Sequence, residues 1–139
     1  MIFLEPEFIA YINKYMVLRF GGAYFAADNN LRDRGTLEYL VEIVQHLADD
    51  CQDTPPVYLV AAEYACRIIT RHIFHDGNKR TGMEALLLCL RMNGVEIAID
   101  PLSDDISDVA LAVAEGRVGV QELVRWIEER AGPPAWPLC

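Results

Sequence analysis

Residues 67–81 read Arg-Ile-Ile-Thr-Arg-His-Ile-Phe-His-Asp-Gly-Asn-Lys-Arg-Thr. They hold four of the chain's twelve Lys and Arg residues, two of its three histidines and a single acid, Asp76. The chain of 139 residues carries a formal net charge of −9, so this stretch reverses the sign of the whole. Such a local reversal favours a bound anion.

The flanking sequence predicts that this stretch joins two helices. Apolar residues recur at helical spacing from Val57, which predicts a helix that runs to about Phe74. Asp76-Gly-Asn has the composition of a tight turn and ends that helix. The helical pattern restarts at Arg80, and the apolar run at residues 85–90 indicates a helix that is buried on most sides.

The same periodicity predicts four further helices, at residues 5–18, 36–48 and 104–114 and from Val120 onward. A long polar loop at residues 28–35 separates the first two. Thr54 before two prolines suits a helix start, and Ser103 suits an N-cap. We therefore expect an all-α fold of about six helices, with one domain at residues 1–132 and a flexible tail at residues 133–139.

The composition excludes several classes of protein. Hydrophobic residues make up 53% and charged residues 24%, which is typical of a folded globular domain. The acidic balance argues against direct binding to DNA, since a DNA-binding protein shows a broad basic surface. The apolar run at residues 85–90 is far shorter than the roughly 18 residues of a membrane span.

The N-terminus and the cysteines indicate a cytoplasmic protein. Met1-Ile-Phe-Leu is followed at once by Glu5 and has no basic segment before it, so no targeting sequence is predicted. The four cysteines show no CxxC spacing. Cys66 and Cys89 fall on apolar helical faces, where a free cysteine acts as a small hydrophobic residue.

The turn in residues 67–81 has the chemistry of phosphate transfer. A helix that restarts directly after a turn presents unpaired N–H groups, which favour phosphate together with the helix dipole. Gly77 permits a close approach of the backbone, and Lys79 and Arg80 add positive charge. Asp76 can hold Mg²⁺ against phosphate oxygens. His72 can take a proton from an attacking hydroxyl, because imidazoles titrate near neutral pH.

Each of these residues also has a simpler interpretation. A histidine at a helix end is more often a cap or a surface group than a catalyst. Lys79 and Arg80 can be a solvated basic edge. Phe74 is predicted to belong to the core. The cluster as a whole is more informative than its members, because it combines a base, a metal ligand and an anion site.

The stretch from His72 to Arg80, His-Ile-Phe-His-Asp-Gly-Asn-Lys-Arg, resembles the signature of the Fic/Doc superfamily, His-x-Phe-x-Asp/Glu-Gly-Asn-x-Arg. The segment Leu31-Arg-Asp-Arg-Gly-Thr-Leu-Glu38 is similar to the loop and helix start of Doc-like members. The resemblance extends over roughly residues 3–130. It implies a compact helical fold with the motif between two central helices.

Three positions depart from the Fic proteins that transfer AMP. Those proteins have proline after the histidine, glycine at the position of Lys79 and a second arginine at the position of Met83. This chain has Ile73, Lys79 and Met83. That combination resembles the Doc (death-on-curing) toxins, which are kinases that move the terminal phosphate of ATP to a threonine of elongation factor Tu. The resemblance implies a protein Ser/Thr kinase, and AMP transfer on the same fold is the alternative.

The resemblance also implies a role for each residue of the motif. His72 would be the base that deprotonates the acceptor hydroxyl, and Asp76 would bind Mg²⁺. The phosphates of ATP would be bound by the next four residues, Gly77, Asn78, Lys79 and Arg80. Thr81 has no clear role beyond capping the next helix. The polar loop at residues 30–34 would help to dock the protein substrate.

The sequence shows no built-in inhibitor. Many Fic proteins carry an inhibitory Ser/Thr-x-x-x-Glu-Gly/Asn helix. Glu115-Gly116 is the nearest match, but Leu111 stands at the hydroxyl position. The resemblance therefore implies a separate antitoxin of the Phd type.

Two interpretations lie outside this chemistry. An HD-type phosphohydrolase is also all-α and would use His46, the pair His75-Asp76, and Asp100 as metal ligands. Gly77 would remove that pair from a helix, and Asn78-Lys79-Arg80 would be unexplained. A catalytically inactive interaction module is the second, and the complete set of polar residues in the motif argues against it.

Overall fold

The computed structural model describes residues 1–49 and 55–131. Its only β-structure within these ranges is a pair of isolated bridges, Leu31–Phe74 and Ile97–Ala131. A short 3₁₀ turn, η1, spans Ala26–Asp28. The prediction of an all-α fold of about six helices is confirmed, since the described ranges contain six α-helices: α1 (Pro6–Phe20), α2 (Arg34–Leu47), α3 (Pro56–Thr70), α4 (Asn78–Met92), α5 (Asp105–Ala114) and α6 (Val120–Arg130).

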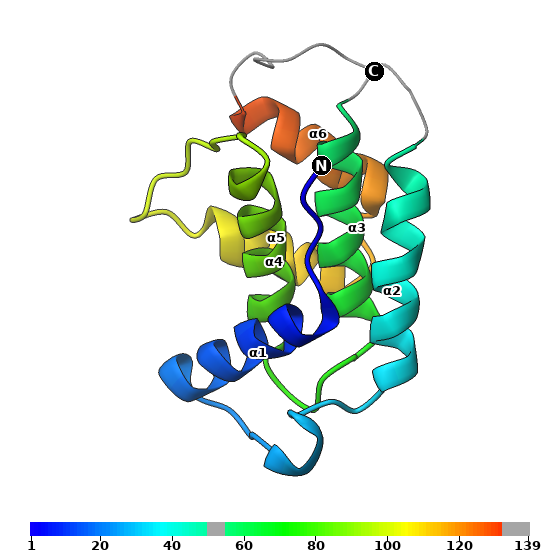
Figure 1. Cartoon of the computed structure of the whole chain (residues 1–139). Coiled ribbons are helices and arrows are strands. Elements are labelled where there is room, and N and C mark those ends of the chain that lie inside the picture. Colours follow the sequence, from blue (N-terminus) through cyan, green and yellow to red (C-terminus); the bar gives the residue numbers. More distant parts are fainter. Residues whose placement is uncertain (50–54, 132–139) are drawn as a thin grey trace.

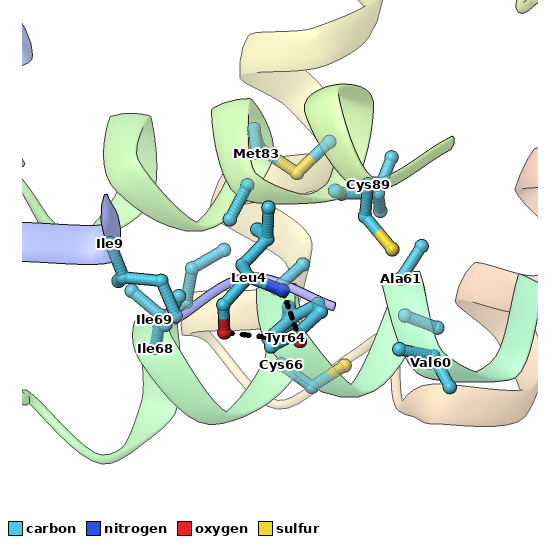
Figure 2. Packing of buried hydrophobic residues seen from close by; sticks show 14 of the residues in the cluster. Leu4, Ile9, Val60, Ala61, Tyr64, Cys66, Ile68, Ile69, Met83 and Cys89 are labelled. Atoms are coloured by element: carbon cyan, nitrogen blue, oxygen red, sulfur yellow. Dashed lines mark hydrogen bonds between the residues drawn. The ribbon is translucent and has the colours of Figure 1, made fainter. Parts of the chain in front are cut away.

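Helix α3 is the centre of the fold. It packs against α2, α4, α5 and α6, while α1 crosses the end of the bundle and contacts α4 and α2 (Figure 1). Tyr64 and Ile68 on α3 are completely buried. The N-terminal segment lies beside them, and the Leu4 N–H donates to the Tyr64 hydroxyl at 3.0 Å (Figure 2). This arrangement leaves the loop between α3 and α4 at one end of the bundle, next to α1.

Close packing between α3 and α4 fixes the position of that loop. A Cβ atom on Gly82 would lie 2.7 Å from Ile69 Cγ1 and 3.1 Å from the Ala65 carbonyl oxygen. The absence of a side chain at Gly82 therefore lets the start of α4 rest directly on the end of α3.

Helix α3 ends earlier than the sequence indicated. The predicted helix ran to about Phe74, but α3 ends at Thr70. The Thr70 hydroxyl donates to the Cys66 carbonyl at 2.6 Å, and His72 then takes a left-handed conformation with φ 50°. The apolar spacing continued through Phe74 because Ile73 and Phe74 are buried in the loop. Phe74 is therefore a core residue, as predicted.

The other helix boundaries differ by one or two residues. Helix α2 begins at Arg34 instead of Thr36, because the Asp33 carboxylate accepts the Thr36 N–H at 3.0 Å. Helix α4 begins at Asn78 instead of Arg80. Helix α5 has Asp104 at its N-cap, and Ser103 makes only a long contact of 3.4 Å with the Asp105 N–H.

Some predictions lie outside the described residues, namely the helix start at Thr54 and the tail at residues 133–139. Cys66 and Cys89 are buried free thiols, as predicted, and burial raises the pKa of each to about 12. No helix within residues 1–49 and 55–131 combines the length and apolar character needed to cross a bilayer.

Candidate active site

Two loops meet at the end of the bundle where α1 crosses it. The first is the α3–α4 loop, residues 71–77, and the second is the α1–α2 loop, residues 21–33 (Figure 1). The Ile73 carbonyl accepts the backbone N–H groups of Arg32 and Asp33, at 2.8 and 3.1 Å, and the His75 N–H donates to the Asn30 carbonyl at 2.9 Å. The α3–α4 loop is thus held by backbone bonds to residues 30–33, which lie far earlier in the chain.

His72 lies in the α3–α4 loop, two residues beyond the end of α3. Its φ of 50° is uncommon for a residue other than glycine. Its side chain is exposed and lines a pocket at this end of the bundle, whereas the next two side chains, Ile73 and Phe74, are buried. The buried pair anchors the loop and leaves the imidazole open to a substrate.

Asp76 is held as a carboxylate. Its Oδ2 accepts the Ala23 N–H at 2.9 Å, and its Oδ1 accepts the Gly77 N–H at 2.8 Å. These two hydrogen bonds lower the pKa of Asp76, and the charges of Arg80 and Lys79 lower it further. The exposed side chain is therefore ionised at neutral pH and keeps lone pairs for a cation.

The donor set around Asp76 fits Mg²⁺ rather than a metal in a protein cage. The part of the chain that the structure describes has no group of three His, Cys, Asp or Glu side chains able to hold a metal. Mg²⁺ is commonly bound through one or two carboxylates, with water and substrate phosphates as the other ligands. Asp76 suits that role.

The N-terminus of α4 follows Asp76 directly. Gly77 is the N-cap residue with φ 78° and provides no side-chain cap. A Cβ atom there would lie 2.8 Å from Val17 Cγ2, so the position requires glycine for space as well as for backbone angle. The N–H groups of the first helical turn, at residues 78–80, have no acceptor inside the helix and favour an anion.

The two cations of the motif stand beside these N–H groups. Lys79 and Arg80 are exposed and line the same pocket as His72. Neither forms an ion pair with a carboxylate of the described residues. The Arg80 guanidinium lies 5.3 Å from the centre of the Phe20 ring. Both charges are thus available to a phosphate.

Asn78 uses its side chain to close the α3–α4 loop. Its Oδ1 accepts the Phe74 N–H and its Nδ2 donates to the Phe74 carbonyl, both at 2.9 Å. The Oδ1 atom and one N–H of the amide are therefore used within the loop, so contact of Asn78 with phosphate is left to the second amide N–H and to the backbone N–H.

The pocket has a volume of about 700 Å³ and two chemically different sides. The motif forms the polar side. The other side is largely apolar and comes from α1, the end of α3, α4 and α5, with the side chains of Met16, Phe20, Ile69, Met83, Leu87, Ile106 and Ala110. Met83 stands at the position where Fic proteins that transfer AMP have their second arginine. It is uncharged and buried, so this position provides no cation to the pocket.

Sequence reasoning missed three buried polar residues under the motif. Asn13 on α1, Asn30 in the α1–α2 loop and Thr81 on α4 are fully buried. Asn30 belonged to a loop that was expected to be exposed, but its side chain points inward. Asn13 interrupts the apolar face formed by Ile9, Ile12 and Met16, and that interruption was the signal available in the sequence.

The structure does not support the phosphohydrolase interpretation. The residues named for it, His46, His75, Asp76 and Asp100, form no metal-binding group in residues 1–49 and 55–131. Glu115, the nearest match to an inhibitory glutamate, pairs instead with Arg117 at 2.6 Å.

Comparison with known proteins agrees with this geometry. Residues 3–90 match the Fic/DOC family. The chain is 28% identical over 120 residues to "Protein kinase doc" of Escherichia phage P1, covering 86% of this chain and 88% of that protein. It is 31% identical over 104 residues to "Toxin Doc" of Mycolicibacterium smegmatis, covering 75% and 80%. With its motif in the loop between the two central helices, this chain is a Doc-like member of the Fic/Doc family.

Proposed function

We propose that this chain is a Doc-like toxin that transfers the γ-phosphate of ATP to a Ser or Thr hydroxyl of a protein. One observation carries the proposal. A single pocket is lined by an exposed imidazole, an ionised carboxylate and the cationic N-terminus of α4. These are the groups that phosphoryl transfer needs, because its catalysis is largely positioning and stabilisation of charge. The relatives named as a protein kinase and as a toxin support the same assignment.

Each group has one task in this reaction. His72 accepts the proton of the acceptor hydroxyl, whose oxygen then attacks the γ-phosphorus. The bond from the γ-phosphorus to the bridging β–γ oxygen breaks, and ADP leaves with the electron pair. Lys79, Arg80 and the N–H groups of α4 stabilise the charge on the phosphate oxygens. Mg²⁺ held by Asp76 would supply further neutralisation of that charge.

The side chains at positions 79 and 83 favour phosphate transfer over AMP transfer. Lys79 places a charge and a long side chain where a glycine would let the backbone approach phosphates closely. Met83 is buried and uncharged, so a second arginine is missing from the pocket wall. Both features weaken the pose that transfers AMP, which is the alternative reaction.

The target and the regulator follow from the same proposal. We assign elongation factor Tu as the protein substrate in the cytoplasm, so that phosphorylation blocks translation. Arg32 and Arg34 of residues 30–34 are exposed and would help to dock it, although Arg34 also pairs with Asp28 at 2.6 Å. A separate antitoxin of the Phd type would restrain the enzyme, since Leu111 stands at the hydroxyl position of an inhibitory helix and Glu115 pairs with Arg117.

Mass spectrometry of a bacterial extract tests the proposal. The extract is incubated with Mg²⁺, ATP and either the wild-type chain or His72→Asn. We expect a gain of one phosphate on a threonine of elongation factor Tu with the wild-type chain only. A gain of AMP on the target would contradict the kinase assignment, and phosphate on another protein would contradict the target.

A further inference from the structure

The three buried polar side chains below the motif form one network. Asn13 Nδ2 donates to the Asp76 carbonyl at 2.8 Å and to Thr81 Oγ1 at 3.0 Å. Asn30 Nδ2 donates to Asn13 Oδ1 at 3.0 Å, and Asn30 Oδ1 accepts the Phe25 N–H at 2.9 Å. The network therefore connects α1, the α1–α2 loop, α4 and the backbone of the motif.

Burying polar side chains costs free energy unless each polar atom has a hydrogen-bond partner. Across residues 1–49 and 55–131, every buried side-chain nitrogen and oxygen has a hydrogen-bond partner. An unbonded amide in an apolar core is destabilising, because its hydrogen bonds to water are lost without replacement. Apolar residues at the positions of Asn13 and Asn30 would avoid that risk, but they would leave the Asp76 carbonyl without its buried donor.

The Asp76 carbonyl dictates how the amides are oriented. A carbonyl oxygen can only accept, so the NH₂ group of Asn13 must face it. The Oδ1 of Asn13 then faces Asn30, which must present its own NH₂ group. Asn30 thus fixes the orientation of Asn13, and Asn13 fixes the peptide between Asp76 and Gly77.

Asp76 is consequently held at three points. Asn13 binds its carbonyl, the Ala23 N–H binds Oδ2 and the Gly77 N–H binds Oδ1. Asn13 also lies directly against the turn, because a Cβ atom on Gly77 would be 3.1 Å from Asn13 Nδ2. Any rotation of the Asp76–Gly77 peptide would break the bond to Asn13 and move the Gly77 N–H away from Oδ1, which removes one of the two bonds that orient the carboxylate.

We infer that Asn13 is a positioning residue, supported by Asn30 and Thr81, that sets the direction of the Asp76 carboxylate and of the first N–H groups of α4. It acts through the peptide between Asp76 and Gly77 and touches no reacting atom. The inference rests on the proposed function only for the reaction that this positioning serves.

Replacing the donor without changing the shape tests the inference. Asn13→Asp keeps the size of the side chain but loses both N–H bonds of the amide. We expect amide hydrogen exchange at Ala23 and Gly77 to accelerate at least tenfold, since their acceptor is the released carboxylate. In the transfer assay, the Mg²⁺ concentration for half-maximal rate should rise about tenfold.

Thr81 provides a second, independent pair of variants. Thr81→Val removes the hydroxyl that accepts from Asn13 and keeps the shape, whereas Thr81→Ser keeps the hydroxyl. We expect Thr81→Val to accelerate exchange at Ala23 in the same direction as Asn13→Asp, and Thr81→Ser to exchange like the wild-type chain. This pair decides the question even where Asn13→Asp does not fold.

Tyr64→Phe is the matched control. It removes a buried hydrogen bond of 3.0 Å to Leu4, in the core between the N-terminal segment and α3 (Figure 2). It should lower overall stability without changing exchange at Ala23 or the Mg²⁺ dependence. The inference is overturned when Asn13→Asp and Thr81→Val leave exchange at Ala23 unchanged, or when Tyr64→Phe accelerates it equally. A wild-type chain that transfers no phosphate would contradict the proposed function alone, because hydrogen exchange does not depend on the reaction.

Discussion

Two short loops of this molecule each join a pair of consecutive helices, but their side chains differ in chemistry. The α3–α4 loop carries the motif, and the α5–α6 turn spans residues 115–119. Each contains a glycine with φ 78°, Gly77 in the first and Gly116 in the second. At the α5–α6 turn, the Glu122 carboxylate accepts the Gly119 N–H at 3.2 Å, and Glu115 pairs with Arg117. The N-terminus of α6 is thus stabilised by the chain's own acids.

The N-terminus of α4 is compensated less fully, although the Asp76 carboxylate accepts the N–H of its N-cap residue, Gly77, at 2.8 Å. Its first turn holds no acid, whereas the first turn of α6 contains Glu122, and Lys79 and Arg80 add to the positive end of the α4 helix dipole. A pocket lies in front of it, and a buried polar network lies behind it. The difference supports the proposal that an external anion binds at the N-terminus of α4.

Loss of the base should have the largest effect. His72→Asn keeps a residue type that tolerates the left-handed conformation but cannot act as a general base. We expect the rate of phosphate transfer to fall about 10²- to 10⁴-fold, measured with labelled ATP and purified target. His46→Asn replaces an exposed histidine on α2 that lies outside the pocket, and it should keep the wild-type rate. Equal losses in both variants would contradict the role of His72.

Gly77 and Gly116 have the same φ but different surroundings. Comparing their alanine variants therefore separates the cost of steric overlap from the cost of backbone strain. Gly116→Ala meets no atom within 4 Å and should cost about 1 kcal/mol of unfolding free energy, from its left-handed conformation alone. Gly77→Ala also meets Val17 at 2.8 Å, so its cost should reach about 3 kcal/mol. Urea unfolding measures both values. A cost at Gly77 no larger than at Gly116 would show that the motif is not tightly packed on α1.

Arg80 and Arg117 carry the same charge in the two loops, so removing each one tests whether the position of the charge matters for ATP binding. Arg80→Ala should raise the KM for ATP about tenfold or more, because a charge-assisted hydrogen bond to phosphate is worth about 1.5–3 kcal/mol. Arg117→Ala in the α5–α6 turn removes the same charge and should leave that KM unchanged. Steady-state kinetics at one ionic strength provides the measurement. An equal rise in both variants would indicate a general effect of charge on binding.

The smallest effect concerns the contact that joins α5 to α6. Asp105 accepts two bonds from Arg130, at 2.6 and 2.8 Å, and one from Trp126, and these lower the pKa of Asp105. Asp105→Asn should cost about 1 kcal/mol at neutral pH. A lowered pKa contributes stability above the ordinary carboxyl value of about 3.9, and the contribution is lost as the pH falls through the lowered pKa. Unfolding experiments should therefore show the two chains converging in acid, and a difference that persists there would contradict the assignment.

The sequence predicted the helices and the motif because both depend on local patterns. Apolar spacing is local, and so is the composition of Asp76-Gly-Asn. The end of α3 was misplaced because Ile73 and Phe74 are buried by the α1–α2 loop and continue the apolar spacing without the helix. The pocket was not predictable, since Met16, Met83 and Ile106 come from three helices that only the tertiary fold brings together.

The buried network of Asn13, Asn30 and Thr81 also could not be predicted from local sequence patterns. Asn30 has the composition of an exposed loop, and no local pattern distinguishes it from Asn29. Its burial follows from backbone bonds between residues 30–33 and residues 73–75, which are contacts across a large separation in sequence. Asn13 was detectable as a polar residue on an apolar face, but its partner was not.

The most direct test is to measure which phosphate of ATP is transferred to the target protein. Purified chain and elongation factor Tu are incubated with Mg²⁺ and ATP labelled at either the γ- or the α-phosphate, with His72→Asn as the control. The account predicts that only the γ-label enters the target and that His72→Asn removes it. Label from α-phosphate in the target, or γ-label that persists in His72→Asn, would contradict a phosphate-transfer site built on the α3–α4 loop.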